Sequence, residues 1–183
     1  MQISLIAAVS SMPSSSWPPQ KQDGNYVIGK NNQLVWRLPA DMKYFREITE
    51  GHHVLMGRKN FLSIPQKFRP LVNRTNIIAT HNKDFLKSPD QSCKVVHSIE
   101  EGISFSKQNN ETELFIIGGG EIYSQTINLA TKLYITWVHS AFGGDTFFPE
   151  INFLLWKEIF RQDFQVDEKH NFAYSFCVYE KIL

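Results

Sequence analysis

The sequence predicts an α/β domain with a mixed, mainly parallel central sheet of about eight strands, an antiparallel C-terminal strand and about four flanking helices. Two observations predict it. Short apolar runs alternate with amphipathic stretches along most of the chain, which is typical of parallel strands covered by helices on both faces. The last third instead holds two aromatic, alternating segments without a helix between them, which indicates antiparallel pairing. In such sheets ligands bind at the carboxyl ends of the strands.

The predicted strands are the short apolar runs. Residues 3–9 are almost continuously apolar, as expected of a strand buried on both faces. Similar runs, together with the two aromatic segments of the last third, lie at residues 54–56, 76–79, 95–97, 114–117, 133–138, 157–165 and 172–180.

The predicted helices lie between these runs, at residues 41–50, 58–63, 99–107 and 121–129. In the first of them Met42, Phe45 and Ile48 fall on one side. Ser98 followed by Glu101 is a capping-box pattern, which marks the start of the third helix.

Residues 10–26 do not fit this alternation. They hold five serines, three prolines and one glycine, and 17 residues exceed the usual loop of a compact domain. We expect a loop insertion within a single domain spanning residues 1–183. A disordered surface insertion and a functional lid or binding loop are both open interpretations.

Composition excludes several classes of function. With 19 basic and 18 acidic residues the net charge is +1, and no basic stripe indicates nucleic acid binding. The apolar run near the start, residues 5–9, is far shorter than the roughly 20 residues of a membrane span, so no membrane partner is expected. Two cysteines, Cys93 and Cys177, make no disulfide framework, which favours a reducing compartment and predicts a cytoplasmic protein.

The first candidate site is Asp41, which follows Pro39 at the expected start of a helix. One interpretation is structural, because a carboxylate in the first turn favours the helix dipole. The second interpretation is a carboxylate that binds a ligand. Phe45 lies four residues after Asp41, so the carboxylate shares a helix face with an aromatic ring. A carboxylate among apolar neighbours needs a partner, and a ligand with amidine-like donors would supply one.

The second candidate is the run Met56-Gly57-Arg58-Lys59-Asn60, a strand leading through glycine into a helix. Arg58 and Lys59 place two cations in the first turn of this helix, where they oppose the helix dipole. This unfavourable placement brings no local gain in stability. A bound phosphate would remove the conflict. The alternative is a pair of solvated surface cations.

The third candidate is the triple glycine of residues 118–120, again between a strand and a helix. Glycines there let the backbone approach a pyrophosphate closely. The run is not the dinucleotide fingerprint and lacks its following acidic residue, so a plain tight turn is an equal alternative. Glu121 would itself satisfy the dipole of the following helix.

Other chemistries find less support. Arg74 could clamp a carboxylate, and Thr136 could partner a buried one, although a solvated arginine and a strand-forming threonine are the simpler interpretations. The pair His52-His53 lacks the spacing of a helical metal site, so we predict no metal. No motif indicates a covalent nucleophile.

Taken together, these segments resemble the dihydrofolate reductase family over nearly the whole chain. The matching segments, in order, are Ile3-Ser4-Leu5-Ile6-Ala7-Ala8-Val9, Val27-Ile28-Gly29-Lys30, Trp36-Arg37-Leu38-Pro39-Ala40-Asp41, Met56-Gly57-Arg58-Lys59, Ser63-Ile64, Arg69-Pro70-Leu71, Arg74, Ile117-Gly118-Gly119-Gly120-Glu121-Ile122-Tyr123 and Asp145-Thr146-Phe147-Phe148-Pro149.

The resemblance implies an NADPH-dependent oxidoreductase that reduces 7,8-dihydrofolate to tetrahydrofolate, passing a hydride to C6 of the pterin while N5 gains a proton. It implies that Asp41 holds the pterin, with Thr136 bonded to that carboxylate, Trp36 fixing a water nearby, and Arg74 clamping the glutamate tail. The catalytic group so implied is Asp41, Trp36, Leu34 and Thr136. The substrate-binding residues so implied are Ile6, Ala8, Met42, Phe45, Ile64, Leu71, Arg74, Ile117 and Tyr123.

For NADPH, the resemblance implies a cis peptide between Gly118 and Gly119 and recognition of the 2′-phosphate by Arg58, Thr80 and His81. The implied cofactor residues are Ala8, Ile28, Gly57, Arg58, Lys59, Asn60, Thr80, His81, Gly118, Gly119, Gly120, Glu121, Ile122 and Tyr123. It also implies a monomer whose folate pocket accepts antifolate inhibitors.

Three departures from the family pattern stand out: Asn60 in place of a threonine or serine, Val35 in place of a proline, and the lengthened loop. Two alternatives remain open. One is a pyrimidine reductase of riboflavin synthesis on the same fold, and the other is a non-catalytic pterin- or nucleotide-binding module.

Overall fold

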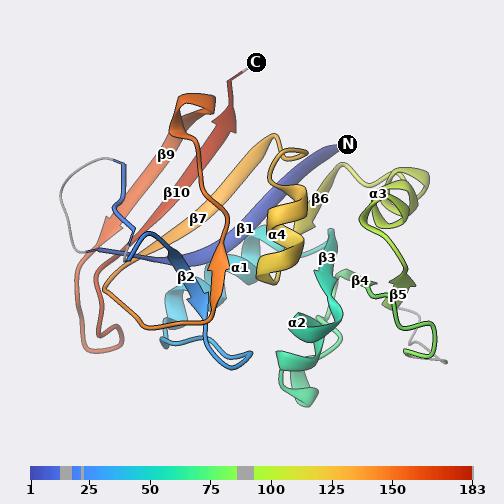
Figure 1. Cartoon of the computed structure of the whole chain (residues 1–183), viewed down its shortest axis with the longest axis horizontal. Coiled ribbons are helices and arrows are strands. Elements are labelled where there is room, and N and C mark those ends of the chain that lie inside the picture. Colours follow the sequence, from blue (N-terminus) through green and yellow to red (C-terminus); the bar gives the residue numbers. More distant parts are fainter. Residues whose placement is uncertain (13–17, 22, 86–92, 183) are drawn as a thin grey trace.

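The computed structural model of the chain describes residues 1–12, 18–21, 23–85 and 93–182. Its centre is an eight-stranded sheet in the order β5-β4-β3-β6-β1-β7-β10-β9 (Figure 1). These strands are β1 Gln2–Ser11, β3 His53–Gly57, β4 Thr75–Ala79, β5 Cys93–Val96, β6 Glu113–Ile116, β7 Lys132–His139, β9 Trp156–Phe164 and β10 Tyr174–Lys181. In the described sheet only β10 runs antiparallel to its neighbours, β7 and β9, while the other pairs are parallel. The predicted fold class is confirmed.

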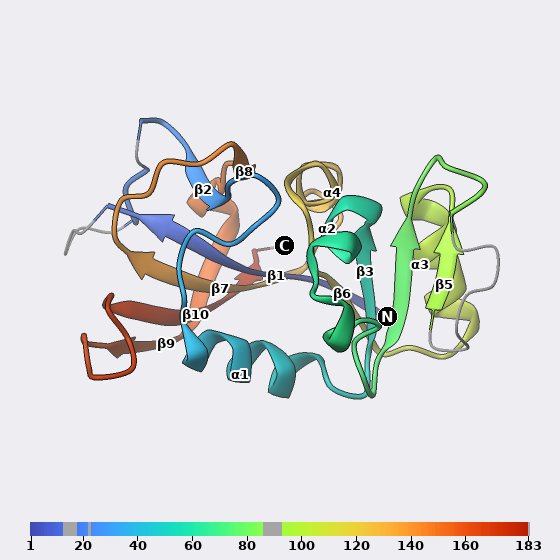
Figure 2. The ribbon, with the colours of Figure 1, turned by 90° about the horizontal axis from the view of Figure 1, so that it is seen from below.

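Within the described residues four α-helices flank this sheet, as predicted (Figure 2). They are α1 Pro39–Thr49, α2 Arg58–Ser63, α3 Ile99–Gln108 and α4 Gly120–Thr126. The third helix begins where the capping box places it, because the backbone N–H of Glu101 donates to Ser98 Oγ at 3.0 Å. The first helix starts two residues earlier than predicted, at Pro39, and the fourth ends three residues earlier, at Thr126.

The alternation of β1 divides the core between the two faces of the sheet. Leu5 and Val9 face the cluster that includes α3 and α4, whereas Ile6 faces the cluster that includes α1 and α2. None of these three β1 side chains exposes more than 5% of its surface. The continuous apolar character of this strand therefore reflects burial on both faces.

A second, two-stranded sheet was not predicted. It pairs β2 Tyr26–Gly29 with β8 Thr146–Phe148 in antiparallel register. Each strand is only three or four residues long and one contains a glycine, so neither presents the periodicity that identifies a strand. Two 3₁₀ turns, Gln66–Phe68 and Phe153–Leu155, are likewise too short to be predicted.

The insertion is shorter than predicted. Ser10 and Ser11 belong to β1, where they pair with Val138 and His139, and Tyr26 belongs to β2. Backbone pairing with β7 thus overrides the polar composition that indicated a loop from residue 10. Of the expected insertion, residues 13–17 and 22 lie outside the described residues. No helix in the described ranges has the length and apolar character needed to span a membrane.

Candidate active site

Asp41 lies in the first turn of α1, against the middle of the sheet. Burial raises the pKa of its carboxyl to about 6, and a hydrogen bond from the Thr136 side chain partly opposes that rise. Thr136 sits in β7 directly opposite Ala8 of β1. The helix spans Pro39–Thr49 and follows Leu38, its N-cap residue, so Asp41 lies within the first turn, as expected, and does not itself cap the helix.

Apolar side chains gather beside this carboxylate on the same face of the sheet. Five of the predicted wall residues pack in one cluster around β3, β4 and β6: Ile6, Phe45, Ile64, Leu71 and Ile117. Leu34 and Met42 are exposed by 55% and 56%. Met42 follows Asp41 directly in α1, so a large apolar side chain stands open beside the half-buried acid, as on a surface that a flat, apolar ligand would cover.

Trp36 is buried beside the start of α1. Its ring packs in a cluster that also holds Ala8 and Ala40, with Val35 on its margin. The indole Nε1 is buried and finds no hydrogen-bond acceptor among the described residues. A buried donor of this kind calls for a water or a ligand atom.

Arg74 directly precedes β4. Hydrogen bonds hold its side chain in place without neutralising its charge. Its Nε donates to the carbonyl of Val72 at 3.0 Å, Nη1 donates to Thr49 Oγ1 at 3.2 Å, and its guanidinium lies over the Phe45 ring. Burial lowers the pKa of this guanidinium. It forms no ion pair within the described part of the chain, which leaves its charge available to an anion.

The glycine turn meets the end of β3. The backbone N–H of Gly57 donates to the carbonyl of Gly118 at 2.8 Å. The peptide between Gly118 and Gly119 is cis, as the resemblance implies. Gly118 has φ +100°, and a Cβ there would lie 2.7 Å from the ring of Tyr123, so only glycine fits.

Tyr123 supports this turn from α4. Its hydroxyl donates to the carbonyl of Ile6 at 2.7 Å, and the side chain is buried. Ile122 of the same helix lies against Gly57, where an added Cβ would come within 3.1 Å. Both side chains therefore shape the turn, and the Tyr123 hydroxyl is already engaged. Gly119 has open space around it, and Glu121 is exposed and bonds Gln125.

The cations of the second candidate stand at the start of α2, next to the glycine turn. No acidic residue occupies that first turn, and neither Arg58 nor Lys59 forms an ion pair with a described residue. The side-chain amide of Asn60 donates to the carbonyl of Ile117 at 2.8 Å, so it links α2 to the glycine turn. Its amide donor is thus used within the protein.

The other predicted cofactor residues lie around these elements. Thr80 and His81 follow β4, the parallel neighbour of β3, so they share the sheet edge at which Arg58 begins α2. Ile28 is half-buried in β2, and a Cβ at Gly120 would strike the backbone of Phe147 in β8. The small second sheet thus packs against the glycine turn.

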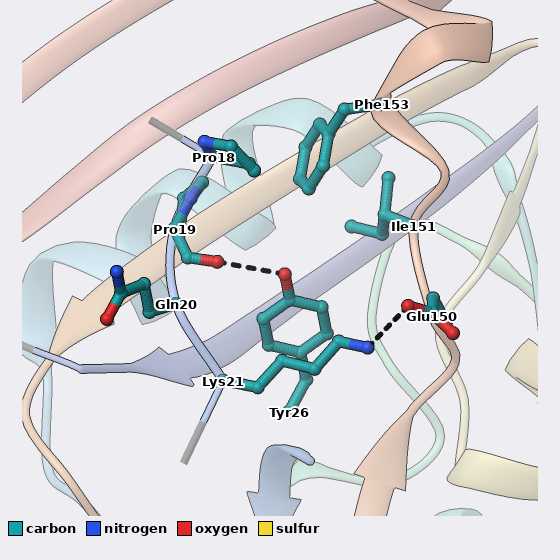
Figure 3. Close-up of a pocket in the computed structure, with 8 residues that line it drawn as sticks. All are labelled: Pro18, Pro19, Gln20, Lys21, Tyr26, Glu150, Ile151 and Phe153. Carbon is teal, nitrogen blue, oxygen red and sulfur yellow. Dashed lines mark hydrogen bonds and ion pairs between the residues drawn. The ribbon is translucent and has the colours of Figure 1, made fainter. Parts of the chain in front are cut away.

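A cavity of about 380 Å³ lies elsewhere, and Asp41 does not line it. It is bounded by the described end of the insertion, Pro18 to Lys21, and by Tyr26, Glu150, Ile151 and Phe153 (Figure 3). Lys21 Nζ contacts Glu150 Oε1 at 2.6 Å, and the Tyr26 hydroxyl donates to the carbonyl of Pro19. The cavity therefore belongs to the attachment of the insertion.

Sequence reasoning missed one residue of the site. His170, in the loop between β9 and β10, accepts a hydrogen bond on Nε2 from the backbone N–H of Ala40, next to Asp41. Nothing in the local sequence indicates this contact, because 130 residues separate the partners.

Comparison with known proteins adds three findings. A family model described as dihydrofolate reductase matches residues 20–181. The dihydrofolate reductases of Staphylococcus haemolyticus and Bacillus subtilis are each 42% identical to this chain over 87% of its length, covering 92% and 90% of those proteins. The structure of dihydrofolate reductase from Enterococcus faecalis, complexed with NADP(H) and RAB-propyl, superposes with a TM-score of 0.81 at 33% identity, covering 98% of this chain and 96% of that one.

Proposed function

This chain belongs to the dihydrofolate reductase family, and from that premise we propose that the cleft around Asp41 binds the pterin of 7,8-dihydrofolate while the glycine turn holds NADPH. The protein catalyses the NADPH-dependent reduction of 7,8-dihydrofolate to 5,6,7,8-tetrahydrofolate. One hydride is added to C6 and one proton to N5. The observation that carries the assignment of the site is a half-buried carboxylate with a raised pKa, bonded to Thr136 and followed in α1 by the exposed side chain of Met42.

Asp41 is suited to hold the pterin and to favour its protonated form. A pKa of about 6 leaves the carboxyl partly protonated near neutral pH, where an acid-base group works best. Its two oxygens can accept from the 2-amino group and N3 of the ring. The Thr136 side chain orients the carboxylate for that contact.

The apolar walls supply orientation. Ile6, Phe45, Ile64, Leu71 and Ile117 form one packed surface that a flat ring can lie on. Rings held face to face at near-attack distance need rigid apolar walls more than reactive groups. Leu34, Ala8 and Met42 are proposed to close the remaining sides.

Trp36 is proposed to position the water through which N5 is protonated. The buried indole Nε1 has no acceptor among the described residues, so a water there would satisfy it. Trp36 also packs in the same cluster as Ala40, the residue before Asp41. Such a water would lie between a fixed donor and the acid.

NADPH, when bound, supplies the hydride from C4 of its nicotinamide. The residues present fit this cofactor, because nothing lies within 4 Å of the position a Cβ would take at Gly119, so the backbone of the glycine turn is open there to a ligand. Arg58 and Lys59 have no described acidic partner and would bind its phosphates, and Arg58, Thr80 and His81 are proposed to recognise the 2′-phosphate. Asn60 is proposed to stabilise the turn through Ile117 rather than to bind the pyrophosphate.

We further propose that Arg74 binds the α-carboxylate of the glutamate tail and that antifolates occupy the pterin pocket. Residues 1–183 are proposed to form one domain and to act as a monomer. A cytoplasmic location is supported by the two cysteines: Cys93 lies in the edge strand β5 and Cys177 near the opposite edge in β10, so they cannot form a disulfide with each other.

The decisive assay follows NADPH oxidation with and without 7,8-dihydrofolate. Turnover with dihydrofolate but not with a ribosylamino-pyrimidine supports the proposed site and excludes the riboflavin-pathway alternative. Binding of both ligands without turnover would favour the non-catalytic alternative. The tail-binding Arg74, which a pyrimidine substrate would not use, already favours folate.

A further inference from the structure

His170 caps the helix that carries Asp41. The residue is 7% exposed, and its Nε2 lies 3.2 Å from the backbone nitrogen of Ala40, in the first turn of α1. Leu38, which precedes the helix, has no side chain able to accept this hydrogen bond. The cap therefore comes from a distant hairpin.

The partners determine which ring nitrogen carries the proton. A backbone N–H can only donate, so Nε2 must offer its lone pair to Ala40. The proton then lies on Nδ1, which donates to Asp167 Oδ1 at 2.8 Å. Asp167 Oδ1 also accepts from the backbone nitrogens of Lys169 and His170, at 2.8 Å each, so the carboxylate is fixed by its own loop.

The groups around the imidazole leave Nδ1 as the ring nitrogen that donates a hydrogen bond. From its own loop Asp167 faces it, from β10 the ring of Tyr174 packs on it at 5.3 Å, and from α1 it meets the turn that bears Asp41. A proton on Nε2 would place its N–H opposite the backbone N–H of Ala40, and two donors cannot form a hydrogen bond with each other. Nε2 of His170 thus acts as the acceptor that caps the helix.

We propose that His170 is a positioning residue for Asp41, and that Asp167 holds it in the tautomer that caps α1. Ala40 is the residue before Asp41, so the hydrogen bond fixes the turn from which the carboxylate reaches Thr136. This inference rests on the function proposed for Asp41. It assigns a role in the reaction to the β9–β10 hairpin.

Two substitutions separate the hydrogen bond from packing. His170→Leu keeps a bulky apolar side chain but removes the acceptor, whereas His170→Gln can place an amide oxygen where Nε2 lies. Asp167→Ala removes the group that holds the tautomer and leaves the ring in place. The matched control is Ser98→Ala, which deletes the side-chain cap of α3, a helix that carries no proposed site residue.

The readouts are the pH profile of kcat/KM for dihydrofolate, the Kd for NADPH and the Tm. Because the Thr136 bond lowers the pKa of Asp41, a displaced first turn weakens that bond and raises the apparent pKa. We expect His170→Leu to raise the apparent pKa of Asp41 in this profile, to lower kcat/KM at neutral pH and to leave NADPH affinity unchanged. Asp167→Ala should shift the profile in the same direction, and His170→Gln should restore it. Ser98→Ala should lower the Tm with an unaltered profile.

Two outcomes would overturn the proposal. One is a His170→Leu profile that superposes on that of the unaltered protein, and the other is equal impairment of the Leu and Gln variants. Carbon NMR titration of the Asp41 carboxyl gives the same answer without turnover. If the unaltered protein fails to reduce dihydrofolate, the proposed function fails, while an Asp41 titration that moves in His170→Leu would still uphold the positioning role.

Discussion

Two carboxylates, Glu111 before β6 and Asp41 beside β7, show how differently this fold treats the same chemical group. Glu111, before β6, accepts hydrogen bonds from the ring of His52 and from the backbone nitrogens of His53, Thr112 and Glu113. These bonds hold its pKa at about 2, although burial alone would raise it. Asp41 has only the Thr136 bond to oppose the desolvation of its half-buried side chain, and its pKa rises to about 6.

The difference distinguishes a structural acid from a reactive one. Glu111 is ionised in the folded protein well below its ordinary pKa, so it adds stability above pH about 4.5 that is lost as the pH falls toward 2. For Asp41 the change of stability with pH has the opposite sign. Its folded pKa exceeds the unfolded one, so stability falls as the pH rises from about 4 to about 6, by up to about 3 kcal/mol. An acid whose desolvation lowers stability at neutral pH is typical of a functional site, where a ligand supplies the partner that the protein does not.

The strongest test of this comparison is Asp41→Asn. We expect turnover at neutral pH to fall by about 10² to 10⁴, the range of acid-base assistance, with NADPH affinity unchanged. Because the buried charge is removed, the free energy of unfolding at pH 7 should increase. Steady-state kinetics and urea unfolding measure the two effects. Full activity in this variant would overturn the role given to Asp41.

Glu111→Gln should give the reverse result. An amide cannot satisfy four donors as a carboxylate does, so the variant should lose about 3 kcal/mol of stability at neutral pH. The loss should vanish near pH 2, where the unaltered side chain is protonated as well. Since none of the hydrogen-bond partners of Glu111 is a proposed site residue, kcat and KM should remain unchanged. A change in KM for dihydrofolate would show that the two carboxylates are coupled.

Arg74→Ala tests the rim of the same cleft. The guanidinium has no described carboxylate partner, and a charge-assisted bond to the glutamate tail should be worth about 1.5 to 3 kcal/mol. The variant should therefore raise the Kd for dihydrofolate by about 10- to 100-fold. A pterin without the tail should bind equally well to both proteins. Equal losses for the two ligands would contradict the clamp.

Periodicity predicted the main sheet and its helices because each long element buries a face with its own regular pattern. The β1 strand and the α3 capping box are examples, since their signals lie within a few residues of each other. The strands β2 and β8 carried no such signal. They exist because tertiary pairing holds three or four residues together, and Ser10 and Ser11 became strand for the same reason.

The residues of the site also differ in how far the local sequence indicates them. The Arg58-Lys59 pair breaks a local rule, whereas Asp41 and the glycine run carry local signals that also allow a structural interpretation, so the local sequence indicates them only in part. The contact of His170 with Ala40 breaks none, because a histidine in a hairpin loop is unremarkable until the chain has folded. Asn60 shows a further limit. Its type departs from the family pattern, but only the structure shows its amide on the carbonyl of Ile117.

A third carboxylate, Glu150, has neither burial nor a set of donors, and so predicts the smallest effect. It meets Lys21 Nζ at 2.6 Å, but its side chain is 76% exposed. An exposed ion pair contributes about 0.2 to 1 kcal/mol and is screened by salt. Glu150→Gln should therefore lower the Tm slightly at low ionic strength and not at all in molar salt. If the loss instead persisted in salt, the attachment of the insertion would depend on the cavity that Glu150 lines rather than on charge.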